Sequence, residues 1–122
     1  MQLIKKTKMH ELSIVMEVVK QVEKLAQEHH VTKVKSVTVE VGEVSGVVKN
    51  YFLDAFDWMC KRNELMKECE LNYITIQAIS YCQDCKKTYP TTKYAKECPY
   101  CHSIHTYLVS GKDFMIKEIK VV

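Results

Sequence analysis

Two Cys-x-x-Cys pairs constrain this chain more than any other feature of its sequence. The pairs are Cys82 with Cys85 and Cys98 with Cys101, and twelve residues separate them. Each pair places two sulfur atoms on one tight turn, and two such turns can supply four thiolates to a tetrahedral zinc ion. The surrounding segment, residues 80–110, holds both prolines of the chain and few aliphatic residues. We therefore predict a zinc-binding module that depends on its metal for stability.

Other interpretations of the four cysteines remain open. Four thiolates also hold iron in electron carriers such as rubredoxin, but those proteins do not need the helices and strands that flank this segment. Cys98 to His102 also spells a c-type haem attachment motif, which is improbable without an export signal. His102 could exchange with a thiolate as the pH falls, or lie beside the ligands as a surface histidine. Cys60 and Cys69 have no ligand spacing, and we expect half-buried free thiols there.

Composition places the chain among small globular proteins. It has 122 residues, 47% hydrophobic side chains and a formal net charge of +3, so one core is expected and no polyanionic partner is demanded. No apolar run approaches the roughly 18 residues of a membrane span. The basic residues 1–8 are not followed by the apolar stretch of a signal peptide. We therefore expect a cytoplasmic protein, because paired cysteines bind metal in a reducing compartment more often than they form disulfides there.

Apolar periodicity predicts two helices and three strands. The first helix runs from Glu11 to about His29-His30, and its buried stripe comprises Leu12, Val15, Met16, Val19, Val22 and Ala26. The second covers about residues 49–63, and its buried stripe comprises Phe52, Ala55, Phe56 and Met59. Alternating residues predict strands at 35–41, 71–79 and 114–121. In the first strand the core-facing residues are Val37, Val39 and Val41.

The order of the predicted elements is helix, strand, helix, strand, zinc module, strand. The module is therefore predicted to be an insertion between two strands of one sheet. The predicted class is α+β, with two helices packed on a small three-stranded mixed sheet and an inserted zinc-ribbon-like module of four cysteines. We expect an extension at residues 1–8, an α/β domain at 9–79 plus 111–122, and the zinc module at 80–110.

Met9-His10-Glu11 is a second candidate metal site. By default, a histidine and a glutamate at the start of a helix form a cap and a favourable first-turn charge. If translation starts at Met9, its amine, the backbone nitrogen of His10 and the imidazole can close adjacent chelate rings around one ion. A nearly planar, nitrogen-rich set of this kind suits Ni²⁺ or Cu²⁺. Glu11 could add an oxygen ligand or orient the imidazole.

Three parts of the sequence resemble the HypA/HybF family of nickel metallochaperones. They are MHELSI from Met9, VEVGEVSGV from Val39, and the two Cys-x-x-Cys turns with the final strand. The resemblance implies a nickel site at Met9, His10 and Glu11, and a structural zinc site at Cys82, Cys85, Cys98 and Cys101. It also implies a role in maturation of nickel–iron hydrogenase and, in some bacteria, of urease. The implied partners are the GTPase HypB, the hydrogenase large-subunit precursor and urease accessory proteins.

The sequence departs from the family pattern in two places. Eight residues precede Met9, so its nitrogen is an amide in the chain as written. An α-amine loses its proton near pH 8, whereas an amide proton must be displaced by the metal, and we expect Met9 to be the true start. Lys49-Asn50 stand where the family often opens the second helix with proline and an acid. This change reduces helix pre-organisation and alters no chemistry.

We expect a carrier rather than an enzyme. Four thiolates fill the coordination sphere of zinc and leave no position for a reactive water. Glu43 forms no evident acid–base pair with Asp54 or Asp57. The alternative function is a nucleic-acid- or protein-binding zinc ribbon, in which four lysines of the module would meet phosphates: Lys86, Lys87, Lys93 and Lys96.

Overall fold

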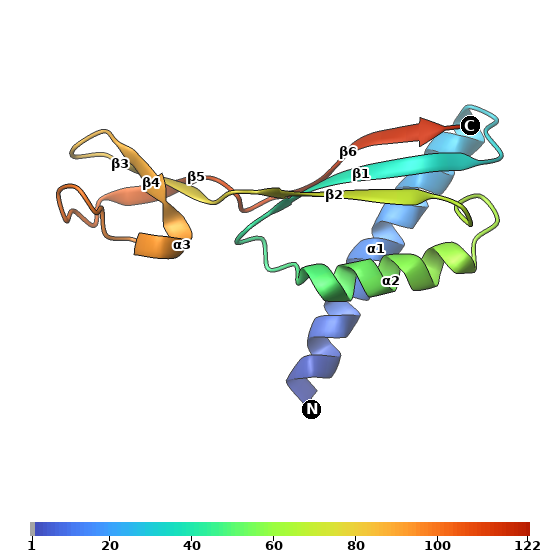
Figure 1. Ribbon diagram of the computed structural model, residues 1–122, viewed down its shortest axis with the longest axis horizontal. Coiled ribbons are helices and arrows are strands. Elements are labelled where there is room, and N and C mark those ends of the chain that lie inside the picture. The colour runs from blue at the N-terminus through green and yellow to red at the C-terminus, as the bar shows by residue number, and fades with distance from the viewer. Residues whose placement is uncertain (1) are drawn as a thin grey trace. The chain divides into compact units, whose positions relative to one another are not determined.

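The computed structural model describes the backbone of residues 2–122 and the side chains of residues 10–122 (Figure 1). Its helices are α1 (Gln2–Glu28), α2 (Lys49–Lys61) and α3 (Thr91–Tyr94). Its strands are β1 (Val34–Gly42), β2 (Glu70–Ile76), β3 (Ile79–Cys82), β4 (Thr88–Pro90), β5 (Thr106–Ser110) and β6 (Phe114–Val121). The predicted order of elements is confirmed. Among the described residues, no helix combines the length and apolar character needed to cross a membrane.

The strands form two three-stranded sheets, in the orders β2-β1-β6 and β4-β3-β5. The first sheet is mixed, because β2 runs with β1 and β6 runs against it. Four hydrogen bonds fix these directions: Asn72 Nδ2 to Thr38 Oγ1, Glu43 N to Ile76 O, Gly42 N to Asp113 O and Val122 N to Lys33 O. In the second sheet, β4 and β5 both run antiparallel to β3. The predicted α+β class with an inserted four-cysteine module is confirmed.

The chain divides into two compact units. Unit 1 comprises Met1–Val39, Val47–Asn72 and Ile116–Val122, and unit 2 comprises Glu40–Gly46 and Tyr73–Met115. The boundaries fall inside β1, β2 and β6, so these three strands each contribute residues to both units. The domain limits expected from the sequence remain a prediction.

α1 begins well before Glu11, where the sequence predicts the helix to start. Residues 2–8 contain neither glycine nor proline and include several good helix formers, so nothing in them stops a helix. Glu11 therefore lies inside α1 and is not a first-turn charge. The other end agrees with the prediction, because α1 ends at Glu28 and His30 adopts a φ of 56°.

The buried stripe of α1 is displaced from the predicted one. Met16 is 45% exposed, and Leu12 is only half-buried. The buried residues of this helix are Glu11, Val15, Val18, Val19, Val22 and Ala26. Because successive helical residues are rotated by about 100°, a stripe that passes through Glu11 and Val18 leaves Leu12 and Met16 at its margin. The prediction of Met16 in the core is wrong for this reason.

α2 and β1 complete the core of unit 1. α2 buries Phe52, Phe56 and Cys60, and the rings of Phe52 and Phe56 stack with centroids 6.2 Å apart. Ala55 and Met59 are half-buried, not fully buried as predicted. In β1, the three predicted core valines at positions 37, 39 and 41 are at most 2% exposed, which confirms that prediction.

The predicted strand 71–79 is divided between the two sheets, because β2 ends at Ile76 and β3 begins at Ile79. Between them, Ala78 is buried against Gly111. A Cβ atom at Gly111 would overlap the backbone of Ala78, and one at Gly42 would overlap the carbonyl group of Gly111. Gly111 also has a φ of 92°. Glycine is therefore required where these segments of unit 2 meet.

Candidate metal centres

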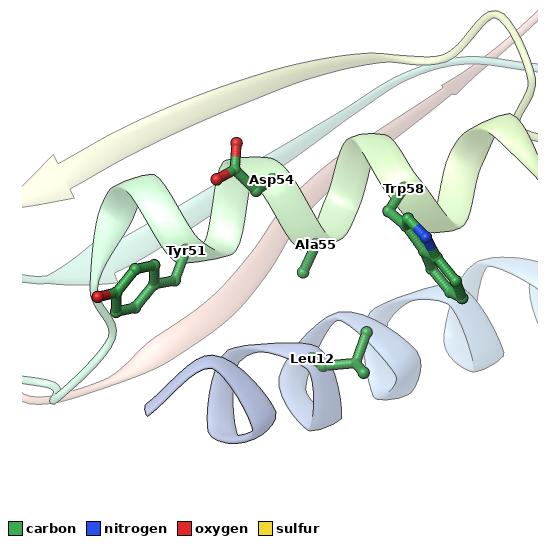
Figure 2. A pocket seen from close by; sticks show the side chains of 5 residues that line it. All are labelled: Leu12, Tyr51, Asp54, Ala55 and Trp58. Carbon is green, nitrogen blue, oxygen red and sulfur yellow. The ribbon is translucent and has the colours of Figure 1, made fainter. Parts of the chain in front are cut away.

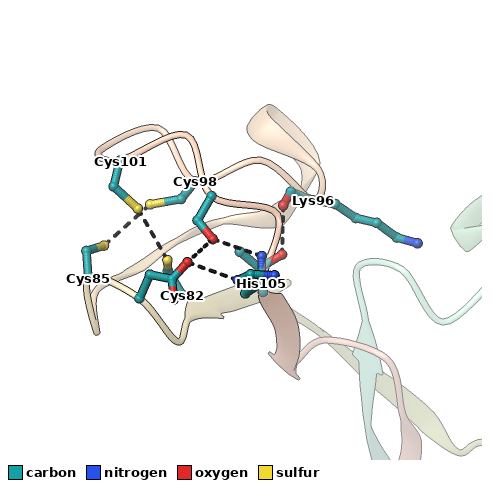
Figure 3. Close-up of polar contacts among 9 residues, drawn as sticks. Cys82, Cys85, Lys96, Cys98, Cys101 and His105 are labelled. Carbon is teal, nitrogen blue, oxygen red and sulfur yellow. Dashed lines mark hydrogen bonds and ion pairs between the residues drawn. The ribbon is translucent and has the colours of Figure 1, made fainter.

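The four cysteines of the two Cys-x-x-Cys pairs form one cluster in unit 2 (Figure 3). Cys82 ends β3, Cys85 lies in the turn before β4, and Cys98 and Cys101 lie between α3 and β5. All four sulfur atoms lie within 4.8 Å of one another. The Sγ–Sγ distance is 3.6 Å between Cys82 and Cys101, and 3.5 Å between Cys85 and Cys98. The structure thus brings together the four residues that the sequence predicts as ligands.

The two turns that carry the cysteines have the same backbone geometry. In each turn the N–H of the first cysteine donates to the carbonyl oxygen five residues later: Cys82 to Lys87 at 2.9 Å, and Cys98 to Ser103 at 3.0 Å. Each first cysteine also accepts a hydrogen bond from the residue four positions on, which is Lys86 or His102. Lys86 and His102 have φ values of 61° and 62°. Both pairs therefore form the same tight turn, with a left-handed residue directly after the second cysteine.

The chemistry and spacing of the cluster fit a tetrahedral metal ion. With Zn–S bonds of about 2.3 Å, tetrahedral sulfurs lie about 3.8 Å apart, close to the two measured distances. The N–H of Tyr100 also points at Cys98 Sγ, at 3.4 Å. A hydrogen bond from the Cys85 backbone, opposed by burial and assisted by the Asp84 backbone, lowers the pKa of the Cys82 thiol to about 7. Cys82 therefore readily forms the thiolate that metals bind.

The core of this module consists largely of the cysteines themselves. Its buried cluster contains Cys82, Tyr89 and Cys98, with Cys85 packed against it. Tyr89 adds a hydrogen bond from its hydroxyl group to Ala95 O at 2.9 Å. One aromatic ring with three thiols is a very small apolar core. A core this small supports the prediction that a metal ion bound by the sulfur atoms stabilises the module.

A polar network that the sequence analysis missed joins the two turns (Figure 3). The carboxylate of Asp84, in the first turn, accepts a hydrogen bond from the hydroxyl group of Ser103, just after the second turn. The same Oδ2 atom lies 3.1 Å from His105 Nδ1, and both contacts lower the pKa of Asp84, that of Ser103 first. Asp84 and Ser103 are 19 residues apart, so no local pattern reveals their contact.

His102 does not point at the sulfur atoms in this structure. Its side chain is 75% exposed, and Nδ1 lies 3.2 Å from Glu97 Oε2. Its backbone contributes the left-handed residue of the second turn. Whether its imidazole exchanges with a thiolate remains a prediction.

The second candidate centre lies on α1 in unit 1. His10 is exposed over 57% of its side chain, and its Nδ1 lies 3.2 Å from Glu11 Oε2. Glu11 is completely buried. Its Oε2 also accepts a hydrogen bond from the Val48 N–H at 3.1 Å, just before α2 begins. Its Oε1 has no hydrogen-bond partner among the described residues. The side chain of Met9 lies outside the described residues.

Beside this end of α1, a cavity of about 270 Å³ opens between α1 and α2. Figure 2 shows its lining: Leu12, Tyr51, Asp54, Ala55 and Trp58. Its wall is mainly apolar, and Trp58 is 50% exposed. The guanidinium of Arg62 lies 4.0 Å from the centroid of the indole ring.

Two of the carboxylates considered for catalysis have partners of their own. Glu43 accepts a hydrogen bond from the Ala78 N–H at 3.0 Å in unit 2. Asp57 forms an ion pair with Lys61 at 2.9 Å. Two lysines of the proposed nucleic-acid surface stack on tyrosines of their own chain: Lys87 lies 4.8 Å from the Tyr100 centroid and Lys93 lies 5.7 Å from that of Tyr94.

Comparison with known proteins gives a consistent result. Residues 9–121 match the family model described as HypA, hydrogenase/urease nickel incorporation, metallochaperone. The hydrogenase maturation factor HypA of Actinobacillus succinogenes is 30% identical over 113 residues, which cover 93% of this chain and 99% of the relative. The hydrogenase maturation factor HybF of Salmonella typhimurium has the same identity and coverage. The solution structure of the Ni metallochaperone HypA from Helicobacter pylori has a TM-score of 0.65 and 23% identity, covering 92% of this chain and 97% of that one.

Proposed function

This chain belongs to the HypA family, and from that premise we propose that it carries Ni²⁺ at Met9-His10-Glu11 and holds Zn²⁺ in its four-cysteine cluster. The family incorporates nickel, and the relatives are hydrogenase maturation factors. The chain is accordingly a metallochaperone of hydrogenase maturation and not an enzyme. The expectation that it carries a metal and does not catalyse a reaction agrees with its family.

The observation that carries the nickel proposal is the pairing of an exposed histidine with a buried, incompletely satisfied glutamate. A buried carboxylate oxygen without a partner is costly, and Oε1 of Glu11 is such an atom among the described residues. A cation bound at His10 would offset that cost. Because His10 remains largely exposed, a partner protein can reach the ion and exchange it, as a carrier requires.

The contact between His10 and Glu11 distinguishes two ways of binding nickel. Through Nε2, the imidazole can bind the ion while Nδ1 remains on the carboxylate, which orients the ring and raises its basicity. Chelation together with the backbone nitrogen of His10 uses Nδ1 instead, so the ring must first leave Glu11. We propose that Glu11 holds the ring before nickel arrives and yields it when the chelate forms.

The nitrogen ligands also require a particular start of the chain. The family match begins at Met9. In the helix that starts at Gln2, the amides of Met9 and His10 lie within helical backbone, where N–H groups are hydrogen-bonded to carbonyls four residues earlier. Nickel would have to break those bonds and remove the amide protons. We propose that the form that binds nickel tightly begins at Met9, with an amine there.

Zinc is the metal we propose for Cys82, Cys85, Cys98 and Cys101. The distances between sulfurs, the matched turns and the small cysteine-dependent core support a permanent structural ion. Zinc bound to four thiolates would leave the purified protein colourless. A red protein with visible absorption would indicate iron instead.

The partners we propose are the GTPase HypB and the hydrogenase large-subunit precursor. The family description also names urease, so urease accessory proteins are a further proposed set of partners. Nickel would pass through the exposed His10 end, and the zinc module would give a rigid docking surface.

A hydrogenase activation assay in cells tests the proposed nickel site. We expect His10→Ala to abolish nickel-dependent activation, and His29→Ala, at the other end of α1, to leave it intact. Excess nickel in the medium should restore part of the activity in the His10→Ala strain, because only delivery is lost. Full activation of the His10→Ala strain without added nickel would contradict the proposal.

A further inference from the structure

The carboxylate of Asp84 links the two turns that carry the cysteines. Asp84 lies between Cys82 and Cys85 in the first turn, whereas Ser103 and His105 follow the second turn. Oδ2 of Asp84 accepts a hydrogen bond from the Ser103 hydroxyl group and lies 3.1 Å from Nδ1 of His105. The His105 N–H in turn donates to Ser103 Oγ at 3.0 Å. These three residues therefore form a closed set of contacts between the two turns.

Asp84 and Ser103 also support ligand sulfur atoms with their backbone. The Asp84 N–H is hydrogen-bonded to the Cys82 sulfur, and the Ser103 N–H is hydrogen-bonded to the Cys101 sulfur. These two sulfur atoms lie 3.6 Å apart. The bond between the side chains of Asp84 and Ser103 thus joins the backbone supports of two neighbouring ligands, one from each turn.

The contacts of Asp84 begin where the pairing of β3 with β5 ends. Cys82 is the last residue of β3 and pairs with Thr106. Beyond that pair, the Gln83 N–H donates to the carbonyl oxygen of His105 at 2.9 Å. The side chain of Asp84 carries the connection one residue further, into the turn itself. Because the apolar core of the module is very small, hydrogen bonds between its turns contribute a larger share of its stability.

We propose that Asp84 is a positioning residue for zinc, which holds Cys82 and Cys101 at the spacing of a tetrahedral ion through its bond to Ser103. This role rests on the zinc site proposed above and adds to it a residue that does not touch the metal. Loss of such a partner typically lowers metal affinity by about 10- to 100-fold. The side chain of Asp84 is 54% exposed, so we expect the lower end of that range. Without the bond, all four thiolates remain but the two turns separate more easily, so zinc leaves faster.

Glu97 provides a matched control. Like Asp84, it is a carboxylate directly beside a cysteine of the cluster, and it contacts an imidazole: Oε2 lies 3.2 Å from Nδ1 of His102. Its side chain is 63% exposed, which is similar to that of Asp84. The contact of Glu97, however, joins the two ends of the second turn only. Glu97→Ala therefore removes the same charge near the metal without disconnecting the two turns.

Zinc release from the loaded protein to an excess of a chromogenic chelator tests the proposal. We expect Asp84→Ala to release zinc about 10-fold faster than the wild type, and Glu97→Ala to stay within about twofold of it. Asp84→Asn keeps an acceptor for the Ser103 hydroxyl group, so it should stay within about threefold of the wild type. Ser103→Ala should accelerate release, and D84A/S103A should be no faster than Asp84→Ala, because both changes break one connection.

Cobalt substitution measures whether the ligands themselves change. The visible spectrum of Co²⁺ bound to four thiolates should be the same in the wild type and in Asp84→Ala. An altered spectrum would make Asp84 part of the ligand set and would contradict a positioning role.

Three results of the release experiment would also overturn the role of Asp84 while leaving the zinc site in place. They are release from Asp84→Ala at the wild-type rate, equally fast release from Glu97→Ala, and release from Asp84→Asn as fast as from Asp84→Ala. Wild-type protein that is purified without zinc and takes up none would instead overturn the zinc site itself, and the role of Asp84 with it.

Discussion

Glu11 combines complete burial with a negative charge and one oxygen atom that has no partner among the described residues. Its other oxygen serves two groups, the Val48 N–H and the imidazole of His10. The residue therefore links the candidate nickel ligand to the start of α2. The effect of Glu11 on the free energy of unfolding and its effect on nickel affinity can be measured separately.

Glu11→Gln should separate these two roles. The amide keeps an acceptor for the Val48 N–H and removes a buried charge, so the free energy of unfolding should stay within about 1 kcal/mol of the wild type or rise. Nickel affinity should fall by about 10-fold or more, because the neutral amide no longer provides the buried negative charge that a cation bound at His10 would offset. Urea unfolding and calorimetric nickel titration give the two quantities. Glu17→Gln, at an exposed position of α1, is the control. Unchanged nickel affinity in Glu11→Gln would show that this carboxylate plays no part in the site.

The two cysteines outside the cluster have a different role. Cys60 is buried and Cys69 half-buried, so the expectation of half-burial is right for Cys69 only. Burial, with smaller contributions from Cys69 and Asp57, raises the pKa of the Cys60 thiol from about 9 to about 12. Burial also raises that of Cys69 to about 11. Both residues therefore act as protonated, weakly reactive thiols at neutral pH.

These raised pKa values predict a loss of stability at alkaline pH. Above pH 9 the unfolded chain loses the thiol proton of Cys60, while the folded chain keeps it until about pH 12. The unfolded state then binds fewer protons, so the free energy of unfolding falls as the pH rises through this window. Denaturant unfolding between pH 8 and pH 11 should show the fall, and Cys60→Ala should flatten it while lowering stability at every pH. An equally steep fall in Cys60→Ala would assign the effect to other groups.

The sequence predicts the role of a single residue well only where neighbouring positions in the chain determine that role. The cysteine quartet is recognisable because fixed spacing produces each turn. The network of Asp84, Ser103 and His105 is not recognisable, since it joins residues that meet only after both turns form. The burial of Glu11 is not recognisable either, since the sequence predicts a helix that starts at Glu11, and a glutamate in a first turn is normally exposed.

At the scale of elements, the turn between β5 and β6 depends on glycine. Gly42 and Gly111 touch each other's backbone, and Gly111 also touches Ala78, so side chains are excluded from both. Gly46 has a φ of 89° but nothing within 4 Å of the position its Cβ would occupy. A side chain would therefore meet only backbone strain at Gly46, only crowding at Gly42, and both at Gly111.

Alanine substitutions should distinguish these cases. Gly46→Ala should cost about 1–2 kcal/mol of stability, from left-handed backbone strain alone. Gly42→Ala and Gly111→Ala should each cost about 3 kcal/mol or more, because the backbone must move to admit a methyl group. Chemical denaturation of zinc-loaded proteins measures all three. A cost at Gly42 no greater than that at Gly46 would mean that the close approach is not required.

The element order could be predicted from periodicity because each predicted helix or strand buries one face. The exceptions have physical reasons. α1 extends to Gln2 because its first residues contain no helix breaker. The strand predicted at 71–79 is split because β2 ends at Ile76 and β3 begins at Ile79, with Ala78 buried against Gly111 between them. Apolar periodicity predicts which face of a helix or strand is buried, but it predicts the first and last residues of the element poorly.

At the scale of the whole molecule, the two units should respond differently to metal removal. Unit 1 has a core of valines and phenylalanines, whereas the buried cluster of the module is built mainly from the proposed ligands. A strong chelator should therefore collapse the amide signals of residues 80–110 in an NMR spectrum. Signals from the core of unit 1 should keep their dispersion. Lowering the pH should produce the same pattern, because protons compete with zinc for the thiolates. A module that keeps its dispersed signals after zinc is removed would contradict this account.

The central claim is that nitrogen atoms at the leading end of the chain carry nickel, and that an amine at Met9 is one of them. Calorimetric nickel titration should compare a form that begins at Met9 with one that begins at Met1, each with and without His10→Ala. We predict one tightly bound Ni²⁺ per chain in the form that begins at Met9. We predict at least tenfold weaker binding in the form that begins at Met1, and loss of the site in both His10→Ala variants. Equal affinity in the two unsubstituted forms, or stoichiometric tight binding without the His10 imidazole, would contradict the claim.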